Sequence, residues 1–218
     1  MFPSARTIGT LLIAVTALCA CGQPVQTPGP SGASGENATT VASPPDVDAA
    51  RQAIEGADLA NDDSISALEA IRFTPAGEEA ARDALISGAS GTALWAATWV
   101  YASSAKDPAP LRPLLDNPDA SVRVMAAAGA VAMGERAGFA PLATALSDLD
   151  RLKGSRPPLS IAAFAATTLI RSVAASGAPA PPQAGDTAEA VAARWSAWLD
   201  QHANALQFDQ ATRTWKLP

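Results

Sequence analysis

The amino-acid sequence predicts an all-α protein, an α–α superhelix of stacked helix pairs with a small C-terminal cap rich in tryptophan. After residue 45 apolar side chains recur at helical spacing, alanine is abundant, and aromatic residues make up only 5% of the 218 residues. The apolar pattern also repeats about every thirty residues, as in repeat architectures.

Residues 1–20 have the three parts of a secretory signal peptide. Arg6 supplies a positive charge, residues 8–19 are almost wholly apolar, and small residues follow. The apolar run is shorter than the roughly 20 residues that a mature transmembrane helix needs. We therefore expect this segment to be removed after export.

The end of this segment, Leu18-Cys19-Ala20-Cys21-Gly22, resembles the lipobox of bacterial lipoproteins. In that family an invariant cysteine follows a small residue, with Leu three positions earlier, which implies that Cys21 is lipidated and becomes the mature N-terminus. Cys19 departs from the usual Ala, Ser or Thr. The resemblance implies a lipid-anchored protein of the bacterial cell envelope. Gly22, in place of a retention aspartate, favours the outer membrane facing the periplasm.

A zinc or redox pair is the alternative interpretation of Cys19 and Cys21. A zinc site needs about four ligands, and the chain offers these two cysteines and a single histidine, His202. We therefore expect no metal site, no cofactor and no disulfide in the mature protein.

Residues 21–45 are predicted to be a flexible tether. Beyond Cys21 they consist largely of Gly, Ser, Pro, Thr and Ala with hardly a large apolar side chain. Such a stretch cannot bury enough surface to offset the entropy lost on ordering. It would hold residues 46–218, a length typical of one domain, away from the membrane surface.

Residues 121–134 show the helical pattern most clearly. Asp119 precedes them as a predicted N-cap, after a break at Asn117-Pro118. Their apolar residues fall at positions i, i+3, i+4, i+7, i+8 and i+11, which is one stripe along one helix face. The stripe consists of Val122, Met125, Ala126, Gly129, Ala130 and Met133.

The stripe recurs upstream and downstream, and residues 150–158 are interpreted as a loop inserted before the downstream copy. A second apolar series alternates with the first. Two interleaved series with one period indicate stacked helix pairs, each burying its stripe against its neighbours. The first series continues in Trp95, Ala96, Trp99 and Val100 and in Ala165, Ala166, Leu169 and Ile170, and the second comprises Ala81, Ala84 and Leu85, Leu111, Leu114 and Leu115, and Leu142, Ala145 and Leu146.

Residues 111–148 resemble the short HEAT repeats also found in bilin-lyase-like proteins. The family pattern of paired leucines, an Asp-containing loop, Val-Arg, an Ala-rich helix ending in Gly and a second leucine-bearing helix is present here, with Val122-Arg123 as the Val-Arg pair. The resemblance extends loosely over residues 60–175 and implies an α–α superhelix, a fold that hosts unrelated functions. It also implies that Arg123 is a structural residue reaching back to a loop carboxylate such as Asp116 or Asp119.

Aromatic residues in the second helix of the first pair have two possible roles. Trp95 and Trp99 lie four apart on the stripe, which favours core packing over an aromatic binding strip. Tyr101 falls off the stripe, and we expect it to be exposed.

The C-terminal residues depart from the repeat. Residues 188–199 predict an amphipathic helix, and two alternating stretches, 206–208 and 214–217, predict a small hairpin around residues 209–212. The tryptophans and Phe208 concentrated here favour a hydrophobic cap over the last repeat. The alternative is an aromatic platform for sugar or peptide. His202 is expected to be structural.

Charge and motifs limit the function classes. The net charge is −6 and Lys and Arg do not cluster, which argues against nucleic-acid binding. Nothing resembles a nucleophile elbow, a metal-ligand helix or a phosphate loop, so we expect no catalytic residues. The leading hypothesis is a membrane-tethered scaffold or adaptor that binds a protein partner in the bacterial envelope. A lyase-like enzyme of the HEAT-repeat class and a purely structural envelope lipoprotein are the alternatives.

Overall fold

The computed structural model describes residues 45–218. The predicted signal peptide, Cys21 and all but the last residue of the predicted tether lie outside this part of the chain. None of the helices between residues 45 and 218 has the length and apolar character that crossing a bilayer requires.

The described chain is mostly helical and ends in a two-stranded antiparallel hairpin, as predicted. The first four helices are α1 (Val47–Glu55), α2 (Asp62–Ile71), α3 (Pro75–Ile86) and α4 (Gly91–Ser104). They are followed by the 3₁₀ helix η1 (Ala109–Leu114), α5 (Ala120–Ala132), the 3₁₀ helix η2 (Arg136–Gly138), α6 (Phe139–Ala145), α7 (Ile161–Ser172), α8 (Ala188–His202), β1 (Gln207–Asp209) and β2 (Thr214–Lys216).

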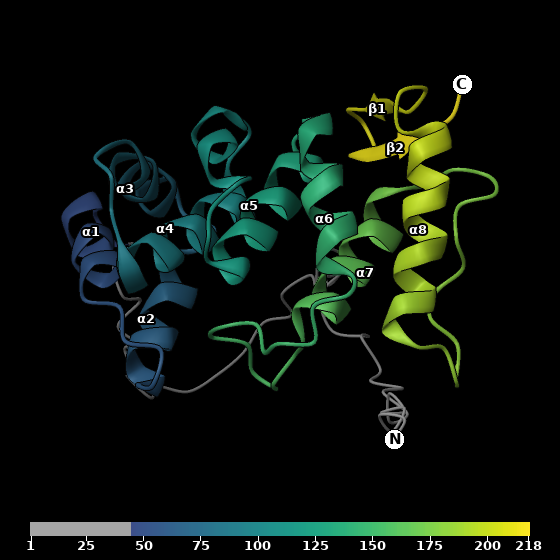
Figure 1. Ribbon diagram of the computed structural model, residues 1–218. Helices are drawn as coiled ribbons and strands as arrows, with labels where there is room; N and C mark the ends of the chain where they lie inside the picture. The colour runs from purple at the N-terminus through teal and green to yellow at the C-terminus, as the bar shows by residue number, and fades with distance from the viewer. Residues whose placement is uncertain (1–44) are drawn as a thin grey trace, which may run out of the picture.

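The elements follow one another across the molecule in chain order, from α1 at one end to α8 and the hairpin at the other (Figure 1). α3 packs on α1 and α4, α4 packs on α5, α5 packs on α6 and α7, and α8 packs on α6. The two predicted series occupy alternating elements. The leucine-rich series lies in α3, η1 and α6, and the stripe series lies in α4, α5 and α7.

Side-chain caps explain where several helices begin. Asp119 accepts a hydrogen bond from the backbone N–H of Ser121 at 3.0 Å and starts α5, as predicted. Asn61 and Thr74 do the same for α2 and α3. Acidic residues in the first turns of these two helices interact favourably with the helix dipole; they are Asp62, Asp63 and Glu78.

The leucine series does not continue as an α-helix at Leu111. This segment is the 3₁₀ helix η1, and Pro113 in its interior lacks the backbone N–H that an α-helix would use there. Leu111 is nevertheless fully buried against α5, as expected for a residue of the apolar leucine series.

Helix α5 is buried on more than the single predicted face. The stripe residues from Val122 to Ala130 are buried, but so are Val124, Ala127 and Val131. The reason is that α4, η1, α6 and α7 surround α5. α4 approaches so closely that a Cβ at Gly129 would lie 2.6 Å from the Cβ of Ala102. α5 is therefore the central helix of the stack.

The expectation that Tyr101 is exposed is wrong. Tyr101 is fully buried, and its hydroxyl donates a hydrogen bond to the carbonyl oxygen of Asp107 at 3.0 Å. Because α3 and α5 both pack on α4, positions off the stripe are covered too. Burial raises the pKa of Tyr101. Trp95 is buried and Trp99 is partly buried against the core, which agrees with core packing.

Arg123 has a structural role, but the prediction that it binds a loop carboxylate is wrong. Its guanidinium donates to the carbonyl oxygens of Asn117, at 2.5 Å, and Pro118, at 3.4 Å. The carboxylate of Asp119 is already engaged by the N–H of Ser121 and by the ammonium of Lys153, at 2.5 Å. Arg123 therefore fixes the loop through its backbone.

The inserted loop at residues 150–158 crosses several earlier elements. The N–H of Lys153 donates to the Ser121 hydroxyl at 3.1 Å, at the start of α5. Gly154 has a φ of +68° and lies against the indole of Trp95 on α4. Arg156 pairs with Asp62 at the start of α2. The loop thus ties the third helix pair to the first two.

Candidate binding pocket at the C-terminal cap

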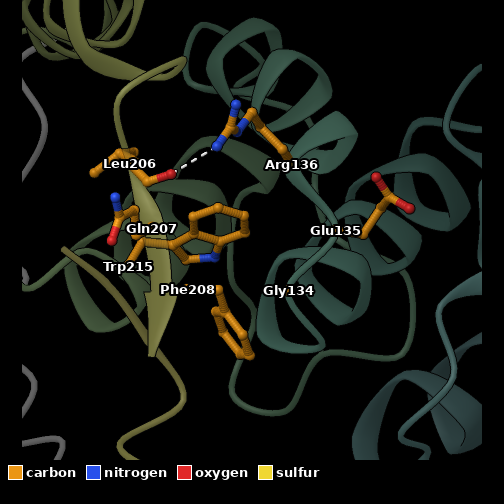
Figure 2. Close-up of a pocket in the computed structure, with 7 residues that line it drawn as sticks. All are labelled: Gly134, Glu135, Arg136, Leu206, Gln207, Phe208 and Trp215. Carbon is orange, nitrogen blue, oxygen red and sulfur yellow. Dashed lines mark hydrogen bonds between the residues drawn. The ribbon is translucent and has the colours of Figure 1, made fainter. Parts of the chain in front are cut away.

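An open pocket of about 480 Å³ lies between the turn that follows α5 and the C-terminal hairpin (Figure 2). It is a shallow depression that opens widely to solvent. Its lining residues come from two segments about seventy positions apart in the chain. They are Gly134, Glu135, Arg136, Leu206, Gln207, Phe208 and Trp215.

Gly134 shapes the wall of the pocket. It follows the end of α5 with a φ of +86°, a conformation that favours glycine. A Cβ at this position would lie 2.7 Å from the Cδ1 atom of Phe208. The missing side chain therefore provides the space in which the Phe208 ring packs against the turn.

The hairpin caps the C-terminal end of α5. The indole N–H of Trp215 donates to the carbonyl oxygen of Val131 at 2.9 Å, and the Arg213 guanidinium donates to that of Ala132 at 3.2 Å. Carbonyl groups at a helix end lack partners within the helix. These two side chains supply them from the far end of the chain.

The aromatic residues of the cap are used in packing. The Trp215 ring contacts the rings of Phe139 and Phe208, with centroid distances of 5.1 Å and 5.3 Å. Trp195 and Trp198 pack edge to face and are also buried. The predicted hydrophobic cap is confirmed. Trp195, Trp198 and Trp215 are buried, so these three rings do not form the exposed part of an aromatic platform.

The carboxylates beside the pocket are paired with cations. Glu135 pairs with Arg112 at 2.6 Å, and Asp209 pairs with Lys216 at 2.5 Å. The hydrogen bond from Lys216, aided by the N–H groups of Thr212 and Ala211, holds the pKa of Asp209 well below its usual range. Each carboxylate therefore lies against a cation that offsets its charge.

Two guanidinium groups near the pocket are held differently. Arg136 donates to the carbonyl oxygen of Leu206 at 2.6 Å and lies 5.8 Å from the ring centroid of Trp215. Arg213 is held by the carbonyl of Ala132. Neither has a carboxylate partner within residues 45–218. Figure 2 shows Arg136 reaching Leu206 beside the Trp215 indole, whereas the Glu135 carboxylate lies apart from the rings.

The other candidate residues of the sequence lie away from this pocket or outside the description. His202 lies against Trp198, with ring centroids 4.9 Å apart and the ring planes tilted by 46°, next to the core of the cap. Cys21 lies outside the described residues. Over the part that the structure describes, no group of three or more His, Cys, Asp and Glu is placed to hold a metal ion.

Sequence reasoning missed this pocket and Arg136. Gly134 was recognised as a helix end and Phe208 as part of a hairpin, but no local pattern connects the two. Arg136 lies in a turn without apolar periodicity, so nothing in its neighbourhood distinguishes it from an ordinary surface arginine. Only the folding of the hairpin onto α5 gives it a defined position.

No protein-family model matches the chain, and no curated protein or solved structure shows significant similarity to it. The resemblances to lipoproteins and to HEAT repeats therefore rest on the residues of this chain alone.

Proposed function

We propose that the protein is a lipid-anchored adaptor of the bacterial cell envelope. It is attached to the outer membrane through Cys21, faces the periplasm, and presents a HEAT-type α–α solenoid to a partner protein. The short lipobox-like stretch ending at Cys21 supports the anchor, and the chain-ordered stack of helices supports the solenoid.

The stacking order is the observation that carries the adaptor proposal. α1 contacts α2, α3 and α4, whereas α8, at the other end of the stack, contacts α6. Helices that contact only elements within a few positions along the chain form an extended surface made of many elements, as repeat proteins do when they bind other proteins. The tryptophans pack in the core and the cap. A partner protein would therefore bind to other surface residues and to the pocket.

A partner search tests the adaptor proposal. Crosslinking the intact lipoprotein in its own membranes, followed by purification, is expected to yield one abundant envelope protein in stoichiometric amounts. A matched lipoprotein with the same anchor and tether but an unrelated domain is the control. Recovery of the same proteins with both, or of none, contradicts the adaptor proposal.

Replacement of the lipidation cysteine tests the anchor separately. The Cys21→Ala variant is expected to leave the membrane fraction, because it has no thiol for the acyl chains that hold the protein at the bilayer. The Cys19→Ala variant is the control and should stay membrane-bound. Fractionation followed by immunoblotting measures both, and membrane retention of the Cys21→Ala variant would place the anchor elsewhere.

A further inference from the structure

The outer edge of β1 has backbone groups available for another strand. The carbonyl oxygen of Trp215 accepts a hydrogen bond from the N–H of Ala174 at 2.9 Å, so the backbone of Trp215 turns toward the end of α7. Phe208 lies opposite Trp215 in the antiparallel register. In an antiparallel ladder, two facing residues that do not bond to each other form a non-hydrogen-bonded pair. The N–H and C=O groups of each residue then point away from the partner strand, toward the outer edge of its own strand. Phe208 therefore directs its N–H and C=O away from β2.

The same edge faces Arg136. Leu206 directly precedes β1, and Leu206, Phe208 and Arg136 line the same pocket. Arg136 donates to the carbonyl oxygen of Leu206 at 2.6 Å. Within residues 45–218 the sheet consists of β1 and β2 only, so no described strand covers this edge.

The charges at this edge select for an acidic partner. The chain as a whole carries a net charge of −6, yet Glu135 and Asp209 at the pocket are already paired. Arg136 is positioned by the carbonyl oxygen of Leu206, which leaves its positive charge uncompensated. A guanidinium presents five N–H donors, so Arg136 keeps donors for a carboxylate after bonding to Leu206.

We propose that the pocket binds an extended acidic peptide segment of the partner protein. The segment adds to the outer edge of β1 through the backbone of Phe208, places a carboxylate on Arg136, and lays an apolar side chain beside the Phe208 ring. Strand addition of this kind derives affinity from backbone hydrogen bonds and specificity from side-chain pockets. This inference rests on the adaptor function proposed above and names the partner's binding segment.

Peptide binding to the full-length lipoprotein in detergent tests the proposal. The probe is a fluorescein-labelled heptapeptide of alternating Glu and Val, and its comparison is the same peptide with Gln in place of Glu. Fluorescence anisotropy should show at least tenfold tighter binding of the Glu peptide. Arg136→Gln, which keeps an amide donor for Leu206, should remove that preference, whereas Arg171→Gln on the exposed face of α7 should retain it.

A measurement on the unmutated protein covers the case in which Arg136→Gln fails to fold. Amide hydrogen exchange should show Phe208 protected when the Glu–Val peptide is bound. Equal affinity for the two peptides, unchanged exchange at Phe208, or an unchanged preference in folded Arg136→Gln overturns the proposal. Arg136-dependent binding to anionic lipid vesicles without peptide binding also overturns it. If the Arg136→Gln variant still crosslinks to the partner, the adaptor proposal is retained and the proposed peptide-binding site is rejected.

Discussion

Glycines in this protein differ in what a side chain would meet. Gly88 and Gly134 both have left-handed backbones, with φ of +81° and +86°. Around Gly88 a Cβ would have open space, whereas at Gly134 it would run into the ring of Phe208. The first glycine is required only by its backbone conformation, and the second also by the packing of the hairpin on α5.

These two glycines make a matched pair for mutation. Gly88→Ala should lower the free energy of unfolding by about 1 kcal/mol, the cost of a left-handed alanine. Gly134→Ala should cost about 1–3 kcal/mol more, because the Phe208 ring is packed against Trp215 and has to be displaced. Urea denaturation followed by circular dichroism measures both. Equal losses of unfolding free energy in the two variants would mean that the Phe208 ring moves aside without cost.

The Asp186 carboxylate contributes to the pH dependence of stability, as Asp209 does, because its pKa is also lowered. Arg194 donates two hydrogen bonds to Asp186, at 3.1 Å and 2.6 Å, and the N–H of Gln183 donates a third at 2.8 Å. The hydrogen bonds from Arg194 contribute most, and together these contacts lower the pKa of Asp186 from 3.8 to about 2. A depressed folded-state pKa adds stability above the unfolded value, and this stability disappears as the pH falls through the folded one.

The Asp186→Asn variant should therefore lose stability at neutral pH and show a flatter decline than the wild type between about pH 4 and about pH 2. Thermal midpoints measured across this range test the expectation. Asp200→Asn on α8 is the control, because Asp200 has no ion-pair partner among the described residues. A decline in Asp186→Asn as steep as that of the wild type would contradict the assignment.

At the scale of elements, the C-terminal hairpin completes the end of α5. Its register places Trp215 opposite Phe208, and Trp215 bonds both to Val131 on α5 and to Ala174 after α7. The indole N–H of Trp195 on α8 is buried equally well but has no partner within residues 45–218. Two buried tryptophans of the same cap thus differ in one hydrogen bond.

Replacement of each tryptophan by phenylalanine isolates that bond. Both changes remove ring volume from the core, but only Trp215→Phe deprives Val131 of a donor. The Val131 carbonyl keeps a second hydrogen bond, from the N–H of Gly134 at 3.1 Å. Trp215→Phe should therefore cost about 1 kcal/mol more than Trp195→Phe, the usual net worth of one hydrogen bond. Chemical denaturation of both variants measures the difference, and a larger loss for Trp195→Phe would reverse this assignment.

For the whole molecule, the helices pack mainly on helices near them in the chain, whereas the loop at residues 150–158 and the C-terminal hairpin also reach segments far away in the chain. Helices α1 and α3 pack at one end and α8 and the hairpin at the other (Figure 1). In a stack of this kind a local loss of stability spreads to neighbouring elements before distant ones.

Amide hydrogen exchange on the Trp215→Phe variant tests this property. Exchange should rise in α5, α6 and α7, which lie next to the hairpin, and change much less in α1 and α3. Gly88→Ala, in the turn between α3 and α4, is the reciprocal control and should affect the opposite end most. A uniform rise along the chain would show that the domain unfolds as one unit, which contradicts the proposed solenoid.

Local patterns predicted many elements well and contacts between distant segments poorly. The apolar spacing in residues 121–134, the cap at Asp119 and the alternation around residues 209–212 each depend on neighbours in the chain, and all three are found in the structure. The exposure of Tyr101 and the partner of Arg123 depend on what packs against them. Both were predicted wrongly, because a single stripe does not indicate how many faces of a helix are covered.

The sequence by itself determined the helical character of the chain, the order of its helices and the hairpin at its end. These follow from side-chain spacing and capping within a few residues. The tertiary structure alone decided that α5 is the central helix, that residues 150–158 reach back to α2, and that the hairpin forms a pocket with Arg136. Such contacts join segments far apart in the chain, and packing over the whole domain, rather than any local pattern, selects them.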